Sequence, residues 1–145
     1  MPEELRPEDV LDSLAKGRLA PFYLFYGPGE FRLEKVLDTI RDRYLPESAR
    51  DLNLEICYGD ETESQEIISR ARSLPFLASN RLIIVRRTEN FRAEALERFL
   101  PYFEDPAETT CLIFVSSKTD FKKKFYKKIK SLGRAVNLFS YRIFS

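Results

Sequence analysis

The sequence contains no histidine and only two cysteines, Cys57 and Cys111. The absence of histidine excludes imidazole catalysis and zinc sites built on histidine ligands. Each cysteine falls inside an apolar run that is typical of a strand. We therefore expect two buried, unpaired thiols, as is usual for a protein of a reducing compartment.

No apolar run approaches the roughly 20 residues that a membrane-spanning helix needs. The segment Met1 to Leu5 also lacks the basic region and apolar core of a signal peptide. We therefore expect a cytoplasmic protein without membrane contact. The 145 residues, 43% hydrophobic and 32% charged, fit one globular domain with a full core.

Short apolar runs alternate with amphipathic segments along the chain. Because continuous apolar strands are typical of a parallel sheet that is covered on both faces, this pattern predicts a three-layer α/β domain. Its five strands, mostly parallel, are expected at residues 22–26, 52–58, 82–85, 111–115 and 135–139.

Helices are expected between these strands. One begins near Pro7, since proline is favoured at a first helical position, and ends at Gly17. A second carries Leu33 to Tyr44. A third is predicted to open at a capping box, Thr62 to Gln65. Two more are expected from the apolar spacing, at residues 96–103 and 121–132.

The chain ends in an apolar stretch, Ser140 to Ser145, directly after the fifth expected strand. A polar terminator is missing there. We therefore expect residues 1–145 to be one domain of a longer protein.

A phosphate-binding loop would be expected after the first strand, where Gly27 stands. Such a loop needs a second glycine, a lysine and a hydroxyl residue at fixed spacing. Those three positions hold Arg32, Leu33 and Glu34. The third strand is followed by Arg86 in place of the aspartate that would organise Mg²⁺. We therefore expect no ATP hydrolysis and no nucleotide cofactor.

Other catalytic or metal-binding groups are not evident. Asp60, Glu61 and Glu63 cluster ahead of a helix, where the helix dipole stabilises carboxylates. Ser116 and Ser117 follow the fourth strand and are interpreted as a solvated turn rather than an anion site. No catalytic residue and no metal ligand is predicted.

The connection Ser73 to Ser79 (Ser-Leu-Pro-Phe-Leu-Ala-Ser) is unusual because it carries three large apolar residues, Leu74, Phe76 and Leu77. Pro75 cannot continue the preceding helix and favours an extended conformation for Leu74. Either these side chains fold back onto the core, with Leu74 completing the stripe of the preceding helix, or they are presented to a partner.

A lysine-rich segment near the end of the chain is a second candidate surface. Its lysines flank an apolar helix face, and they are Lys122, Lys123, Lys124, Lys127 and Lys128. They are candidate phosphate contacts, although a solvated helix face is the simpler interpretation. No base-reading motif accompanies them.

An α/β domain with a degenerate nucleotide site, followed by a helix, Ser-Leu-Pro-Phe-Leu-Ala-Ser and a strand, resembles the N-terminal domain of the bacterial DNA polymerase III delta subunit. The resemblance begins at Pro21 to Gly27 and Glu30-Phe31. It continues through Ser73 to Arg86 and ends with Cys111 to Val115 and the helix that contains Lys127 to Lys130. The first and middle segments carry most of its specificity.

The resemblance implies an AAA+ fold (that of P-loop NTPases) that has lost its nucleotide site. It implies a non-catalytic clamp-loader subunit of the DNA polymerase III holoenzyme, which binds and helps open the sliding clamp, the beta subunit. Helical lid and collar domains, absent here, would join the other clamp-loader subunits. In this family two large apolar residues ahead of a small pair hold the clamp. Phe76-Leu77 before Ala78-Ser79 matches best, Leu74 competes, and Pro75 lies between them.

Two functional classes therefore remain. The first is a clamp-binding module whose anchor lies in Leu74 to Leu77, with at most a weak electrostatic contact to DNA. The second is a stand-alone basic α/β domain that binds nucleic acid or a nucleotide directly through the lysine-rich helix.

Overall fold

The computed structural model describes residues 4–138. The end of the expected fifth strand, Phe139, and the apolar stretch Ser140 to Ser145 lie outside the described residues. Within residues 4–138, no helix is both long enough and apolar enough to cross a membrane.

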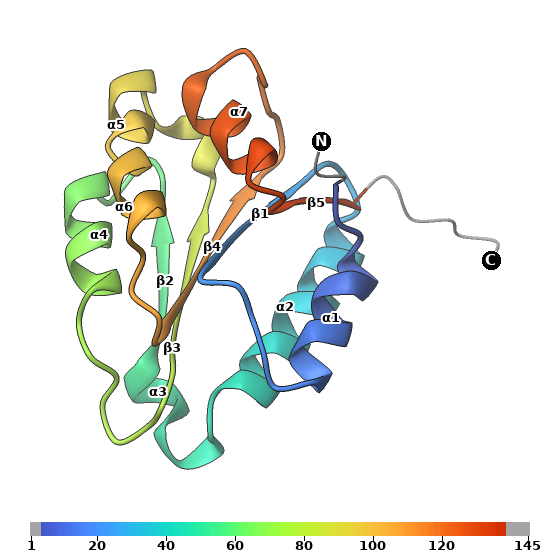
Figure 1. The fold of residues 1–145 in the computed structure, drawn as a ribbon, viewed down its shortest axis with the longest axis vertical. Helices are drawn as coiled ribbons and strands as arrows, with labels where there is room; N and C mark the ends of the chain where they lie inside the picture. Colours follow the sequence, from blue (N-terminus) through green and yellow to red (C-terminus); the bar gives the residue numbers. More distant parts are fainter. Residues whose placement is uncertain (1–3, 139–145) are drawn as a thin grey trace, which may run out of the picture.

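One five-stranded sheet organises the domain, and all of its strand pairs are parallel (Figure 1). The strand order is β2-β3-β4-β1-β5, so the first strand lies inside the sheet and β2 forms one edge. Leu24 of β1 lies opposite Phe114 of β4 and Ala135 of β5. This arrangement confirms the predicted three-layer α/β fold.

The strands are β1 (Phe22–Tyr26), β2 (Leu54–Tyr58), β3 (Arg81–Arg86), β4 (Thr110–Ser116) and β5 (Ala135–Asn137). The longer helices are α1 (Pro7–Ala15), α2 (Glu30–Tyr44), α4 (Ser64–Ala71) and α7 (Lys124–Ser131). Shorter ones are α3 (Arg50–Asn53), α5 (Ala93–Glu97), α6 (Leu100–Glu104) and the 3-10 turns η1 (Glu47–Ala49) and η2 (Thr88–Asn90).

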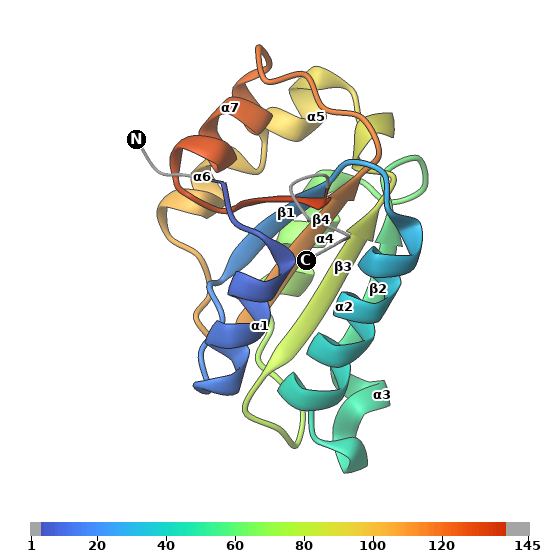
Figure 2. The ribbon, with the colours of Figure 1, turned by 90° about the vertical axis from the view of Figure 1, so that its right-hand side faces the viewer.

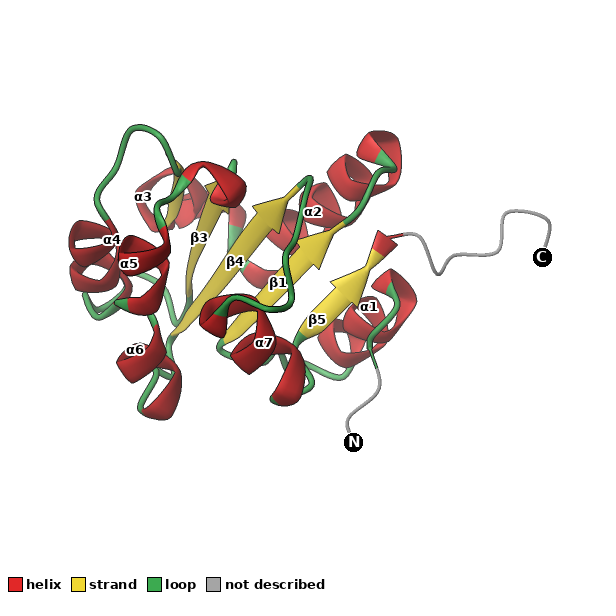
Figure 3. Ribbon diagram, turned by 90° about the horizontal axis from the view of Figure 1, so that it is seen from above, coloured by secondary structure: helices red, strands yellow, loops and turns green. Residues whose placement is uncertain are grey.

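The two faces of the sheet bury separate apolar clusters. Helices α1 and α2 cover one face, where Tyr23, Phe25 and Ile113 point. Helices α4 to α7 cover the other face, where Leu24 and Phe114 point. Figures 2 and 3 show the sheet between these two groups of helices. Because both faces are covered, β1 is buried along its whole length.

Several element boundaries differ from those that the sequence predicts, and the expected strand 135–139 ends at Asn137. The expected strand 52–58 begins only at Leu54, because Leu52 and Asn53 belong to α3. The capping box at Thr62 is wrong: α4 begins at Ser64, and Glu63 is its N-cap without a side-chain cap. Thr62 instead closes the turn after β2, where its N–H donates to the carbonyl of Tyr58 over 3.0 Å.

The expected helix at residues 96–103 is two short helices, α5 and α6. Pro101 accounts for the break, because proline has no N–H to donate to the preceding turn. The expected helix at residues 121–132 begins only at Lys124. The residues before it form a turn in which the Lys122 N–H donates to the Asp120 side chain over 3.0 Å.

Both cysteines are buried and unpaired, as the sequence predicts. Burial raises the pKa of each thiol, so neither is a reactive thiolate near neutral pH.

Phe99 offers a test of the aromatic packing beneath α5 and α6. Its buried ring packs edge-on against Phe114 at 4.9 Å and Phe125 at 6.0 Å between ring centroids. Removing such a ring leaves a cavity, so Phe99→Ala should lower the free energy of unfolding by about 3–5 kcal/mol. Urea denaturation measures this. Leu132→Ala, at a partly exposed site, is the control and should cost far less; a Phe99→Ala loss below about 1 kcal/mol would contradict this packing.

Candidate functional site

The apolar connection lies between α4 and β3 and is here called the apolar loop, residues 72–80. Because the strands are parallel and the loop leads into the start of β3, it lies at the amino-terminal edge of the sheet. The loop after β1, where a nucleotide site would be, lies at the carboxyl-terminal edge. Figure 1 shows the apolar loop at the bottom of the molecule and the end of β1 toward the top.

The three large apolar side chains of this loop are exposed. Leu74 is 79% exposed, Phe76 55% and Leu77 77%, while Pro75 is half-buried. The alternative in which they pack beneath the connection is therefore wrong, and Leu74 does not complete the stripe of α4. The side chains stand in solvent, as a surface that is presented to a partner requires.

The backbone of the loop, in contrast, is held by the buried side chain of Asn53 at the end of α3. The Phe76 N–H donates to Asn53 Oδ1 over 2.7 Å, and Asn53 Nδ2 donates to the Phe76 carbonyl over 2.7 Å. The same amide nitrogen donates to the Ala49 carbonyl over 2.9 Å. Asn53 thus forms a reciprocal pair with one residue of the apolar loop and fixes where Phe76 lies.

Two further side chains tie the ends of the loop. Arg81 donates to the Leu74 carbonyl over 3.3 Å, and Asn80 donates to the Tyr44 carbonyl over 3.1 Å. Between them Leu77 has a φ of +56°. This left-handed conformation costs a leucine about 1–2 kcal/mol, which the surrounding hydrogen bonds must offset. The loop therefore has a defined backbone with its apolar side chains free.

Sequence reasoning missed Asn53. It stands between Leu52 and Leu54 and was assigned to a strand, where a polar side chain has no obvious role. Because a buried asparagine needs hydrogen-bond partners, a single asparagine between two leucines was the feature of the sequence that could have identified this residue.

At the opposite edge, an ion pair occupies the position of a nucleotide site. Arg86, at the end of β3, donates to both carboxylate oxygens of Glu34 in α2, each over 2.8 Å. Arg86 stands where an aspartate would organise Mg²⁺, and Glu34 stands where a phosphate-binding loop needs a hydroxyl residue. The pair borders a hollow of about 500 Å³ that Gly27 and Gly29 also line. Arg86 is thus already neutralised, and Glu34 would oppose a phosphate.

The expected solvated turn at Ser116 and Ser117 is wrong for Ser116, which is the last residue of β4; Ser117 is exposed. Ser116 is buried, and its hydroxyl lies 3.1 Å from the Tyr126 hydroxyl. The Ser117 N–H and hydroxyl donate to Glu89 over 3.1 and 3.0 Å. A carboxylate in this position disfavours an anion here too.

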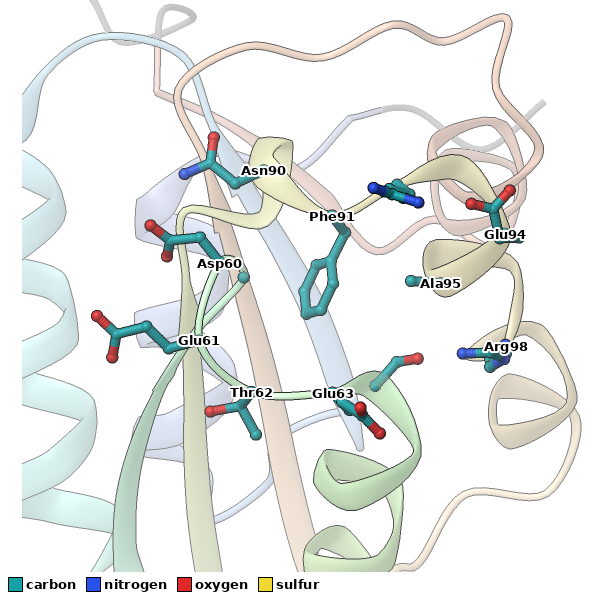
Figure 4. A pocket seen from close by; sticks show the side chains of 12 residues that line it. Asp60, Glu61, Thr62, Glu63, Asn90, Phe91, Glu94, Ala95 and Arg98 are labelled. Atoms are coloured by element: carbon teal, nitrogen blue, oxygen red, sulfur yellow. The ribbon is translucent and has the colours of Figure 1, made fainter.

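The cluster of carboxylates after β2 borders a second hollow at this edge, of about 670 Å³ (Figure 4). Asp60 and Glu61 form ion pairs with Arg87 at 3.2 and 3.3 Å. Glu63 is the N-cap residue of α4, where the dipole favours a carboxylate. Within residues 4–138, no cluster of acidic or cysteine side chains is suited to a metal ion.

The predicted lysines lie on and just before α7, away from the apolar loop (Figure 1). Lys128 is half-buried and pairs with Glu104 at 3.5 Å. The other four are exposed; these are Lys122, Lys123, Lys124 and Lys127. The opposite face of α7 is buried through Phe125 and Ile129. The structure thus does not bring the lysines and the apolar loop into one site.

Comparisons with known proteins agree on one family. The family model for "DNA polymerase III, delta subunit" matches residues 23–139. The DNA polymerase III subunit delta of Bacillus subtilis is 29% identical over 132 residues, which cover 84% of this chain and 38% of that protein.

Two solved structures have a similar fold, and one of them is a delta protein. A DNA clamp loader delta protein of Bacillus subtilis matches with a TM-score of 0.78 and 27% identity, over 91% of this chain and 41% of that one. A DNA polymerase III gamma subunit-related protein of Thermotoga maritima matches with a TM-score of 0.65 at 16% identity, over 92% and 45% of the two chains, and shows the fold alone. The chain thus spans about two fifths of the length of the relatives it matches.

The role of Asn53 can be tested with Asn53→Ala. The substitution removes three hydrogen bonds and should lower the free energy of unfolding by about 1–3 kcal/mol. It should also accelerate hydrogen exchange at the Phe76 amide, measured by NMR. Asn90→Ala, at an exposed asparagine, is the matched control. Unchanged exchange at Phe76 would show that Asn53 does not hold the loop.

The ion pair between Glu34 and Arg86 predicts a pH-dependent stability. The hydrogen bonds from Arg86 lower the pKa of Glu34 below its ordinary value of 4.5. The pair therefore stabilises the fold above that ordinary value, and its contribution is lost as the pH falls through the lowered pKa. Glu34→Gln should be less stable than wild type in thermal unfolding at pH 7, and the difference should shrink below pH 4.5.

Glu30→Gln serves as the control, because Glu30 lies on the same helix and forms no ion pair within residues 4–138. A difference between wild type and Glu34→Gln that is the same at every pH would rule out the ion pair as its source.

Proposed function

Because the chain belongs to the DNA polymerase III delta subunit family, we propose that it is a clamp-loader subunit domain that binds the sliding clamp through its apolar loop. The observation that carries the proposal is the loop itself. Its backbone is fixed by Asn53, while Leu74, Phe76 and Leu77 are exposed.

Phe76 and Leu77 are the proposed anchors, with Leu74 and Pro75 at the margin of the contact. Burying one large apolar side chain contributes roughly 1.5–3 kcal/mol. Two or three such side chains supply about 3–9 kcal/mol before ordering costs, while micromolar affinity needs about 8 kcal/mol. A fixed backbone reduces those ordering costs, so the loop suits a small anchor that enters a preformed pocket.

The proposed mechanism is non-catalytic. Bound to the clamp, the domain would favour the clamp shape to which its surface binds more tightly, and that difference in affinity is what opens the ring. The ion pair at the degenerate nucleotide position supports a domain that takes no part in ATP hydrolysis. ATP-driven neighbouring subunits of the loader would then time the exposure of the loop.

Three further features belong to the proposal. Residues 1–145 correspond to the N-terminal AAA+-like domain of such a subunit, and its other partners are clamp-loader subunits. It works in the cytoplasm, beside the DNA. The exposed lysines at the start of α7 support a second candidate, direct but weak binding to nucleic-acid phosphates.

The decisive experiment is surface plasmon resonance of the protein over its immobilised cognate sliding clamp. Phe76→Ala/Leu77→Ala should weaken binding at least about 100-fold, since two anchors are lost and each 1.4 kcal/mol corresponds to about tenfold. Circular dichroism should show an unchanged fold, because both side chains are exposed. Leu74→Ala, measured separately, assigns that side chain to the contact or to its margin.

Phe31→Ala is the matched control, because Phe31 is 76% exposed but follows Gly29 at the opposite edge of the sheet. Binding that survives in the double variant would contradict the proposed site. Charge reversal at Lys123, Lys124 and Lys127 should leave clamp binding nearly unchanged. If that reversal has the dominant effect, and on nucleic acid, the second candidate is correct.

A further inference from the structure

A hollow of about 390 Å³ lies beside the apolar loop at the amino-terminal edge of the sheet. It is formed where the ends of α1 and α2 meet the end of the loop. Arg18, Arg43, Tyr44, Asn80 and Glu108 line it. Figure 2 shows that the ends of both helices and the chain entering β3 lie at the same, lower end of the molecule.

The charge of this hollow is unbalanced. It contains the two guanidinium groups of Arg18 and Arg43 and a single carboxylate, that of Glu108. Within residues 4–138, none of the three forms an ion pair, and all three are exposed. Eight other arginines of the described chain do pair with carboxylates; these are Arg6, Arg32, Arg41, Arg50, Arg70, Arg81, Arg86 and Arg87.

The larger hollow at the opposite edge shows that the imbalance is local. There Arg92 and Arg98 also lack ion pairs within the described residues, but four carboxylates line the same space. Those four are Asp60, Glu61, Glu63 and Glu94. Two of them, Asp60 and Glu61, pair with Arg87, so the larger hollow has no excess of positive charge, whereas the hollow beside the apolar loop has one.

The hollow and the apolar loop share Asn80, and a hydrogen bond from this residue joins the loop to α2. Asn80 ends the loop three residues after Leu77, and its side chain donates to the carbonyl of Tyr44, the neighbour of Arg43. Arg18 follows the turn that ends α1, where its N–H donates to the Ser13 carbonyl over 3.0 Å. Both guanidinium groups thus project from the ends of helices packed against the sheet, next to the point where the loop is tied down.

We propose that the hollow is a second contact for the protein that the apolar loop binds, and that it receives an acidic segment of that partner between Arg18 and Arg43. The inference rests on the proposed function for the identity of the partner. The apolar side chains would supply most of the affinity, while the guanidinium groups would orient the partner and accelerate its association. Guanidinium groups suit this role because they bind carboxylates through two parallel hydrogen bonds.

The test uses the same plasmon resonance measurement over the sliding clamp, repeated at several salt concentrations. Arg18→Ala/Arg43→Ala should weaken binding about five- to tenfold at low salt, chiefly through slower association, and should flatten its dependence on salt. Glu108→Gln should have the opposite effect and tighten binding, because among the described residues that line the hollow it removes the one carboxylate that competes for the guanidinium groups.

Arg92→Ala/Arg98→Ala is the matched control, since it also removes two unpaired arginines that line a hollow. If both arginine pairs weaken binding equally, the effect is one of overall charge and the inference is wrong. If Arg18→Ala/Arg43→Ala binds like wild type while Phe76→Ala/Leu77→Ala does not, the inference fails and the proposed function stands. A wild-type protein that does not bind the clamp contradicts both.

Discussion

The proposed function of this domain depends on the hydrogen bonds between Asn53 and Phe76. The buried amide side chain of Asn53 satisfies the backbone N–H and carbonyl of the same exposed loop residue, and its nitrogen also donates to the carbonyl of Ala49 at the end of η1. The apolar side chains are consequently held in water on a fixed backbone. Without that tether, the simplest way for three large apolar residues to leave water would be to collapse onto the domain.

The two edges of the sheet differ in how far their charged and apolar groups are satisfied by other groups of the domain. At the carboxyl-terminal edge, the charged groups around the degenerate nucleotide position are satisfied internally: Arg86 pairs with Glu34 and Arg87 with Asp60, while Glu89 accepts a hydrogen bond from Ser117. Little is left at that position to attract a phosphate. At the amino-terminal edge, apolar side chains and two guanidinium groups remain unsatisfied within the described chain. We therefore expect a partner to bind at the amino-terminal edge, away from the degenerate nucleotide site.

The sequence predicts the sheet well because a buried parallel strand needs an unbroken apolar run, as in Phe22 to Tyr26 and Cys111 to Val115. It predicts helix ends less well, because those depend on single hydrogen bonds. Thr62 was expected to cap α4 but is used by the turn after β2. The exposure of Leu74, Phe76 and Leu77 could not be read from composition, since apolar residues usually signal a core. It depends on tertiary hydrogen bonds that hold the loop backbone, chief among them those of Asn53.

A fixed loop also constrains how binding could be controlled. If the loop were disordered when free, a partner subunit could regulate it by promoting or preventing its folding. Here the backbone is already held at Leu74 and Phe76, and the Asn80 side chain bonds to the carbonyl of Tyr44. Its conformation leaves little for a regulator to change. If the loop binds the clamp as proposed, control would act on access: another surface would cover the apolar side chains, and moving that surface would release them. The energy that separates the covered and uncovered states would then lie between this domain and neighbouring subunits of the proposed loader.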